Sequence, residues 1–160
     1  MLNLKQLYLI LEDFLLLHPE VNSVTRLSVK DYIGNRSKIY TNANIHFVSS
    51  SNGAKYITHT FLISISDRLT PTSDNEVEIQ SNVLQIAEDL FTFLADSYDY
   101  TFNKNVNIQT FTESDGDRTA GIFFQLNIQV LRSQNKCILP TDEIITTEKT
   151  FPYDFPIELN

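Results

Sequence analysis

The stretch of sequence that decides the fold is residues 61–96, FLISISDRLTPTSDNEVEIQSNVLQIAEDLFTFLAD. Its first part has the period of two that is typical of a β-strand, because apolar residues alternate with mostly polar neighbours: Phe61, Ile63 and Ile65. Further along, apolar residues recur at a spacing of three and four and share one face of a helix predicted over about 76–96: Ile79, Val83, Ile86, Ala87, Leu90 and Leu94. Ser73 and Glu76 precede that face in an S-x-x-E arrangement, which predicts a capping box. The stretch carries no recognisable reactive group, which favours a role in assembly or binding.

The sequence before this stretch predicts one helix and a set of strands. A helix over residues 3–17 follows from an apolar stripe: Leu4, Leu7, Tyr8, Leu11, Phe14 and Leu15. His18-Pro19 ends this helix, because the residue before a proline disfavours the helical conformation. Strands are predicted over three ranges, 21–31, 38–49 and 54–66, with turns at 33–36 and 49–53. The connection at 49–53 is short, so the second and third strands are expected to pair antiparallel.

The sequence after the helix predicts two further strands, over residues 105–112 and 118–131, joined by a hairpin turn at Asp115-Gly116. The second of these has the cleanest alternation in the chain, with apolar residues pointing one way: Ile122, Phe124, Leu126, Ile128 and Val130. Its opposite face carries Phe123 and amides. This pattern predicts a sheet with one face covered by helices and one wetter face.

Together these elements predict an α+β domain over residues 1–131, with helices packed on a mostly antiparallel sheet in the order helix, three strands, helix, two strands. Residues 132–160 lack a sustained period and predict an extended C-terminal arm. Within the arm, residues 151–157 read FPYDFPI, and an aromatic segment of this kind is expected to dock, either on its own domain or on a neighbouring one.

The composition sets further bounds on function. A chain of 160 residues with 42% hydrophobic residues is expected to form one domain with a real core. Its formal net charge of −8 and the absence of a cluster of cations disfavour tight binding to nucleic acid. The single cysteine, Cys137, excludes an intramolecular disulfide. The apolar N-terminal segment is interrupted by Glu12-Asp13, so we expect neither a targeting signal nor a membrane span.

The sequence predicts no catalytic, cofactor-binding or metal-binding residue, and therefore no enzyme. His46 and His59 are expected to be strand residues on a half-exposed surface. The alternative, a metal site formed by the two facing each other across a hairpin, lacks a third ligand at matched spacing. Cys137 has no neighbouring base to activate it. Three carboxylates surround the turn glycine: Glu113, Asp115 and Asp117. Their order is not that of a calcium-binding loop, so we expect a solvated hairpin tip.

Four places are candidate subunit contacts. The helix over 3–17 has apolar residues off its main stripe, which indicates either deep burial or a face shared with a neighbouring subunit. Asp67-Arg68, where a strand ends, is either a plain turn or an inter-subunit ion pair. Acidic residues at the start of the second helix suit its positive end, and the arm carries aromatic anchors. The candidate contact residues are Leu9, Ile10, Leu16, Leu17, Asp67, Arg68, Glu76, Glu78, Phe151, Tyr153 and Phe155.

Several of these stretches together resemble a known family. They are SISDRL (64–69), DNEVEIQSNVLQIAEDLFTFL (74–94), FTESDGDRTAGIFFQLNIQV (111–130) and KCILP (136–140). Over roughly residues 55–140 the chain resembles small neck or tail-terminator (head–tail joining) structural proteins of tailed bacteriophages that infect Bacteroides-like hosts, including crAss-like phages.

The resemblance implies a virion protein, assembled in the host cytoplasm, that forms a homo-oligomeric ring at the head–tail junction or at the tail end. Such rings are commonly six- or twelvefold, surround the DNA channel without binding DNA specifically, and contact other neck or tail proteins. The resemblance implies no catalytic residue, no cofactor and no membrane.

Two other hypotheses about function stay open. One is a monomeric α+β binding or accessory module that uses the wetter sheet face, with the arm folded back on its own domain. The other is an enzyme with a cryptic site, for which His46, His59 and Asp67 are the residues to mutate.

Overall fold

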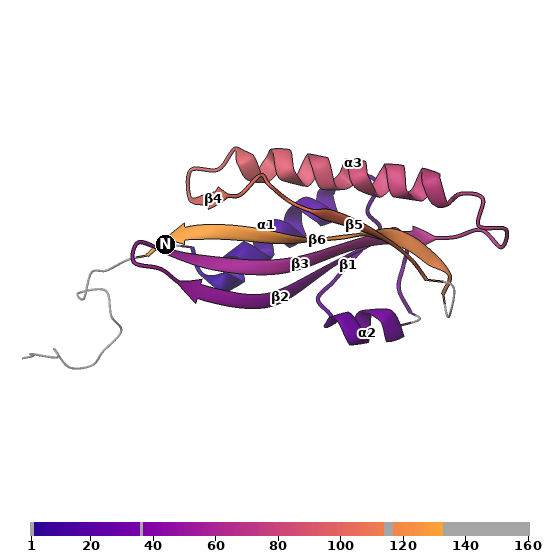
Figure 1. The fold of residues 1–160 in the computed structure, drawn as a ribbon, viewed down its shortest axis with the longest axis horizontal. Helices are drawn as coiled ribbons and strands as arrows, with labels where there is room; N and C mark the ends of the chain where they lie inside the picture. The colour runs from indigo at the N-terminus through magenta and orange to yellow at the C-terminus, as the bar shows by residue number, and fades with distance from the viewer. Residues whose placement is uncertain (1, 36, 114–116, 133–160) are drawn as a thin grey trace, which may run out of the picture.

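The computed structural model describes residues 2–35, 37–113 and 117–132. The chain forms three helices and six strands over this part (Figure 1). In chain order they are α1 (Leu4–Leu17), β1 (Ser23–Thr25), α2 (Val29–Gly34), β2 (Asn42–Asn52), β3 (Tyr56–Arg68), α3 (Glu76–Ala95), β4 (Tyr100–Phe102), β5 (Ile108–Glu113) and β6 (Thr119–Leu131). Residues 133–160 of the predicted arm (132–160) and the hairpin turn at Asp115-Gly116 lie outside the described residues.

One sheet holds all six strands, in the order β1-β2-β3-β6-β4, with β5 also paired to β6. β1 runs parallel to β2, and every other pair is antiparallel. The longest ladder joins β3 to β6, from Tyr56 opposite Leu131 to Arg68 opposite Thr119. The other edge of β6 is shared by β5 and β4, which pair with its beginning and its end. The predicted α+β class with a mostly antiparallel sheet is confirmed. The order of elements along the chain differs from the prediction, because α2 lies between β1 and β2 and three strands follow α3.

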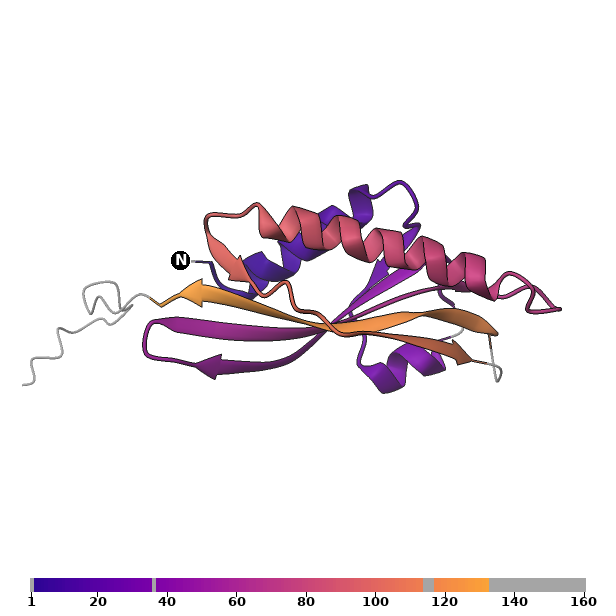
Figure 2. The ribbon, with the colours of Figure 1, turned by 45° about the horizontal axis from the view of Figure 1, so that its top comes forward.

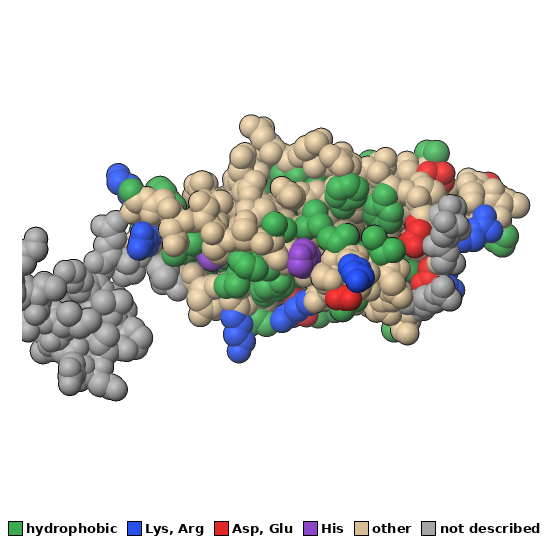
Figure 3. Space-filling model, turned by 60° about the horizontal axis from the view of Figure 1, so that its bottom comes forward, with side chains coloured by type: hydrophobic (Ala, Val, Ile, Leu, Met, Phe, Trp, Pro, Cys, Tyr) green, Lys and Arg blue, Asp and Glu red, His purple; other side chains and the backbone are tan. Residues whose placement is uncertain are grey.

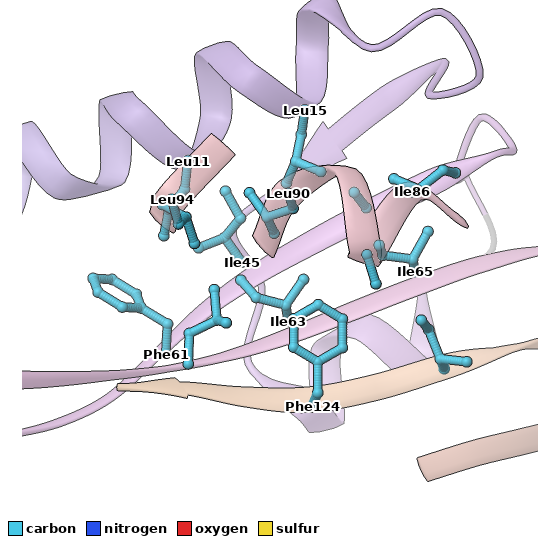
Figure 4. Close-up of a cluster of buried hydrophobic side chains, with 14 of the residues drawn as sticks. Leu11, Leu15, Ile45, Phe61, Ile63, Ile65, Ile86, Leu90, Leu94 and Phe124 are labelled. Carbon is cyan, nitrogen blue, oxygen red and sulfur yellow. The ribbon is translucent and has the colours of Figure 1, made fainter. Parts of the chain in front are cut away.

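The sheet separates α1 and α3 on one face from α2 on the other (Figure 2). The core lies between the sheet and the pair α1 and α3, where Leu11 and Leu90 approach Ile45 and Ile63 (Figure 4). The predicted apolar face of α3 is confirmed, because all six of its residues are buried. The alternations in β3 and β6 are confirmed as well, since their apolar residues point into this core.

α1 follows the prediction closely. Asn3 caps it, since its Oδ1 accepts the backbone N–H of Gln6 at 2.9 Å, while the Gln6 side chain accepts the N–H of Asn3 at 2.8 Å. The helix ends at Leu17, directly before His18-Pro19. The middle of its predicted stripe is buried: Leu7, Leu11 and Leu15.

The predicted strand over 21–31 is wrong for most of its length. β1 covers only Ser23–Thr25, and α2 then runs from Val29 to Gly34, where the end of the strand and the start of a turn were expected. The Ser28 hydroxyl accepts the N–H of Asp31 at 3.2 Å and so caps α2. The alternation of Leu27 and Val29 had predicted a strand here instead. β2 begins later than predicted and continues to Asn52, with an irregularity in register between Phe47 and Ser49.

The predicted strand over 105–112 is also only partly right. β5 begins at Ile108, and the three-residue β4 (Tyr100–Phe102) was not expected. Between them the chain turns, since the side chain of Asn103 accepts the N–H of Asn105 at 3.0 Å. Asparagine side chains compete with strand ladders for backbone groups in this way.

The predicted capping box at Ser73 and Glu76 is wrong. Ser73 has a φ of 57°, and Asn75 occupies the cap position without a side-chain cap bond. The Asn75 side chain instead accepts the N–H of Thr70 at 2.9 Å and donates to the carbonyl of Arg68 at 3.2 Å. This amide therefore fastens the start of α3 to the end of β3.

Candidate interaction surfaces

The outer side of α1 is an exposed apolar strip. Leu9, Leu16 and Leu17 have 40%, 53% and 83% of their surface exposed, while Ile10 is half-buried against the core. The predicted surplus of apolar residues on this helix is therefore real for three of the four residues. A cluster of exposed leucines on one helix costs solubility unless a partner covers it.

This strip continues into a hollow between α1 and α3. The hollow has a volume of about 600 Å³, and its apolar wall comes from four side chains, Ile10, Phe14, Leu17 and Phe93. The rings of Phe14 and Phe93 stack with centres 4.7 Å apart, yet Phe93 remains 43% exposed. We call the exposed leucines and Phe93 the α1 strip.

A polar pair closes one side of the hollow. Nε2 of His18 lies 3.2 Å from Oδ2 of Asp89, so the end of α1 is held to the middle of α3. Gln85 donates a second hydrogen bond to Asp89 at 3.0 Å. The hydrogen bond with His18, followed by that from Gln85, lowers the pKa of the Asp89 carboxyl below its ordinary value.

Asp67 and Arg68 are the last two residues of β3 and not a turn. Oδ2 of Asp67 accepts the hydroxyl of Thr41 at 2.8 Å, and Oδ1 accepts the N–H of Arg68 at 2.7 Å. The Arg68 guanidinium lies over the ring of Tyr40, 5.3 Å from its centre. Within the described part of the chain neither residue forms an ion pair. Their pairing across a subunit boundary stays a prediction.

The two glutamates at the start of α3 differ in their surroundings. Glu76 accepts hydrogen bonds from Thr112 of β5 and, at 3.2 Å, from Gln80, so it ties the helix to the sheet. Glu78 is exposed in the same helical turn. Of the two candidate contacts, only Glu78 has its side chain free of partners among the described residues.

A pocket on the opposite face of the sheet was not predicted. It lies between α2 and the sheet, has a volume of about 310 Å³, and is lined mainly by apolar and aromatic side chains: Val29, Tyr32, Ile33, Leu62, Phe111 and Phe123. Figure 3 shows hydrophobic side chains gathered on this face of the molecule. The α2 pocket was not predicted, because residues 29–34 were assigned to the end of a strand and the start of a turn. The Ser28-x-x-Asp31 spacing was the signal for that helix.

Buried polar groups hold α2 in place beside this pocket. The hydroxyl of Tyr32 lies 2.5 Å from Oγ of Ser66, and Nζ of Lys38 donates to the carbonyl of Tyr32 at 2.6 Å. Nζ of Lys38 also lies 3.9 Å from the centre of the Tyr32 ring. Burial raises the pKa of Tyr32 to about 12, and burial lowers the pKa of Lys38. These groups are occupied with each other, so we assign them a structural role.

The rest of this sheet face is polar, as the sequence predicted. Gln125 and Gln129 are exposed on β6, and Asn127 accepts the hydroxyl of Thr60 at 2.9 Å. A hollow of about 380 Å³ on this face is lined largely by amides and also touches Leu62 and Phe123.

His46 and His59 are strand residues, as predicted, and they do not face each other. The register places His46 opposite Leu62 and His59 opposite Ser50. Nδ1 of His59 lies 2.6 Å from the hydroxyl of Ser50, and burial lowers the pKa of His59. Within residues 2–35, 37–113 and 117–132, no group of three or more His, Cys, Asp or Glu residues is placed to hold a metal ion.

Several predicted residues lie outside the described part of the chain: Cys137, Phe151, Tyr153 and Phe155. Among the helices that the structure describes, none is both long enough and apolar enough to cross a bilayer. A scan against protein-family models finds no family that matches this chain, and no curated protein gives a significant match. The surfaces themselves therefore carry the functional argument.

Proposed function

We propose that this chain is a structural subunit that associates with copies of itself into a ring, of the neck or tail-terminator type found at the head–tail junction or tail end of tailed bacteriophages. The observation that carries the proposal is the α1 strip, in which Leu16 and Leu17 project from the end of a helix whose opposite side is fully buried. The ring would be six- or twelvefold and would surround the DNA channel.

The size of the α1 strip supports association. Fully burying a leucine or phenylalanine that is otherwise exposed contributes about 1.5–3 kcal/mol. Covering Leu16, Leu17 and Phe93 together would supply several kcal/mol, which offsets much of the cost of fixing one subunit against another. Polar groups such as Asp89 border this strip, as is usual at the rim of an interface.

The charge of the chain fits a channel through which DNA passes. A net charge of −8 disfavours adhesion to phosphates, because tight binding needs clusters of lysine and arginine. The amide-rich face of the sheet offers hydrogen-bonding groups without cations, so it would contact DNA weakly. The resemblance of residues 55–140 to neck and tail-terminator proteins supports the same role.

The test of this proposal is the oligomeric state of the full chain. Light scattering coupled to size exclusion should give a mass several times 18.4 kDa, and electron microscopy should give ring-shaped class averages that also report the symmetry. A double variant, Leu16→Lys with Leu17→Lys, should shift the mass towards that of a monomer. Val77→Lys is the matched control, because Val77 is 78% exposed on α3 outside the hollow.

The possible outcomes distinguish a ring from a monomer and show whether the α1 strip is the specific contact. A wild-type chain that remains a monomer at every concentration, in solution and under the microscope, rules out the ring. Equal loss of assembly in the Val77→Lys control would mean that the α1 strip is not the specific contact, because Val77 lies between the candidate contacts Glu76 and Glu78. In both lysine variants the circular dichroism of the folded chain should be unchanged, because the substituted side chains are exposed.

A second candidate function is a monomeric binding module. The α2 pocket favours it, since concave and mostly apolar sites of about 300 Å³ or more are typical of small-ligand pockets. A monomeric wild-type chain would move this function to first place. Nuclear magnetic resonance would then locate ligands by shifts at Leu62, Phe111 and Phe123.

A further inference from the structure

The α2 pocket has the form of a groove for an aromatic or proline-containing segment. The rings of Phe111 and Phe123 lie with centres 6.3 Å apart on its sheet side, and Tyr32 adds a third ring. On its helix side, Val29 and Ile33 are 45% and 57% exposed. Exposed apolar residues that face an aromatic groove indicate that something covers them.

The chain itself contains a segment of the matching chemistry. Residues 151–157 read FPYDFPI, with three aromatic side chains spaced by two prolines. Proline holds a segment near the polyproline conformation before binding, so less entropy is lost when it docks in an aromatic-lined groove. Aromatic side chains are also the residues that contribute most to interface affinity.

The length of chain allows this segment to reach the pocket of another copy. Phe151 is 19 positions beyond Arg132, and a fully extended chain of that length spans at most about 68 Å. Arg132 lies at the far end of the sheet, where its N–H donates to the carbonyl of Lys55 at 2.8 Å. The pocket residue Phe123 is eight positions before Leu131, so the exit point and the pocket are about 26 Å apart along β6.

The direction of β6 places the exit point of the chain and the pocket at opposite ends of the sheet. β6 begins beside the pocket and runs away from it, so the chain leaves the domain at the end opposite to the pocket (Figure 1). A donor at one end and an acceptor at the other make a head-to-tail contact, which closes into a ring when the rotation between copies allows.

We propose that residues 151–157 of one copy dock in the α2 pocket of the next copy. This inference rests on the proposed ring and names one contact that builds it. The segment has one carboxylate, Asp154, and the pocket has one, Glu113, so the contact is apolar and not ionic. Added salt should therefore leave it intact, because screening weakens only charge pairs.

Docking is tested with a fluorescent peptide of residues 148–160 and the full chain carrying Phe151→Ala and Phe155→Ala, which leaves its pocket empty. The peptide should bind, and Val29→Asp in the full chain should weaken binding at least tenfold. Ile33→Gln should weaken it as well. Val77→Asp is the matched control, because it is the same change at an exposed valine in the first turn of α3, and it should leave the affinity unchanged.

Exchange between copies is tested by mixing two variants of the full chain. A Val29→Asp chain keeps its donor segment, and a Phe151→Ala, Phe155→Ala chain keeps its acceptor pocket. Sedimentation velocity should detect more dimers in the mixture than in either chain alone, because only the mixture has a donor and an acceptor. If each segment docks on its own chain, the wild-type chain will stay a monomer although the mixture forms dimers, which would overturn the inference.

The results also separate this inference from the proposed function. A wild-type ring that persists unchanged in the Val29→Asp and arm variants overturns arm exchange and leaves the ring in place. A wild-type monomer whose peptide binding is lost with Val29→Asp overturns both the ring and the exchange, since the segment then serves its own pocket. If Val29→Asp leaves peptide binding unchanged, the α2 pocket is not the docking site.

Discussion

Gly121 of β6 lies opposite Ser66 and directly against the backbone of β3. A Cβ added there would lie 2.1 Å from the carbonyl oxygen of Ile65 and 2.8 Å from Cα of Ser66. Both contacts are with backbone, which cannot move aside as a flexible side chain would. The sheet therefore needs glycine at this position, close to the bond between Ser66 and Tyr32 that anchors α2.

Gly121→Ala should lower the free energy of unfolding by about 2 kcal/mol or more, because overpacking forces backbone shifts. Gly34→Ala is the matched control, since nothing lies within 4 Å of a Cβ there, and alanine is the better helix former. Urea unfolding of both variants measures the difference. Equal stabilities would show that the strands separate at Gly121 without cost.

His59 should make stability depend on pH in a specific direction. Burial lowers its pKa below the ordinary 6.5, so the unfolded chain takes up a proton that the folded chain resists. Stability should be full above about pH 6.5 and should fall as the pH drops from there towards the folded pKa. Urea unfolding at a series of pH values should show this loss in the wild type, and His59→Gln should remove that part of it. An imidazole that titrates above its ordinary value by nuclear magnetic resonance would contradict the sign.

At the scale of elements, the loop between β3 and α3 depends on Asn75. Asn75→Ala removes two hydrogen bonds to backbone groups, at Thr70 and Arg68, and should lower stability by about 1–2 kcal/mol. Ser73→Gly should keep or slightly raise stability, because Ser73 has a positive φ that glycine adopts without strain. Thermal unfolding of the two variants distinguishes this geometry from a Ser73 capping box, in which Ser73→Gly would be the costly change.

The long elements were predictable because burial imposes a period on them. α1, α3, β3 and β6 each place a stripe or an alternating face in one core, so their types and faces could be read from residues such as Val83 and Phe124. β1 and β4 have three residues each, too few to show a period. They exist because β2 and β6 offer them an edge, which is a property of the assembled sheet.

The candidate surfaces were predictable to a smaller extent. Leu16 and Leu17 could be singled out because they lie off the buried stripe of α1. The α2 pocket could not, because it joins Val29 to Phe111 and Phe123, which are far apart in sequence and meet only once the sheet has formed. Asp67 was left open between a turn residue and a subunit contact, because its partner in the structure, Thr41, is equally remote in sequence.

At the scale of the whole molecule, association should be visible in thermal stability. If copies bind each other only when folded, mass action raises the melting temperature as protein concentration rises. The Leu16→Lys, Leu17→Lys variant should melt at one temperature over the same range, because its subunits no longer associate. Differential scanning calorimetry at concentrations a hundredfold apart measures both. A wild-type melting temperature that is independent of concentration would contradict the predicted ring.

The central place of β6 in the sheet has a consequence for how the protein is made. β6 is the last strand in the described chain, yet β3, β4 and β5 all pair with it. During synthesis the β2–β3 hairpin and α3 leave the ribosome first, with the apolar faces around Ile63 and Leu90 still open to water. The ladder from Tyr56 to Leu131 joins residues distant in sequence, so folding should be slow and should finish only after β6 has emerged. A nascent chain halted before Thr119 is therefore expected to depend on chaperones, because its incomplete sheet exposes the unpaired edge of β3 and apolar core residues, both of which favour aggregation.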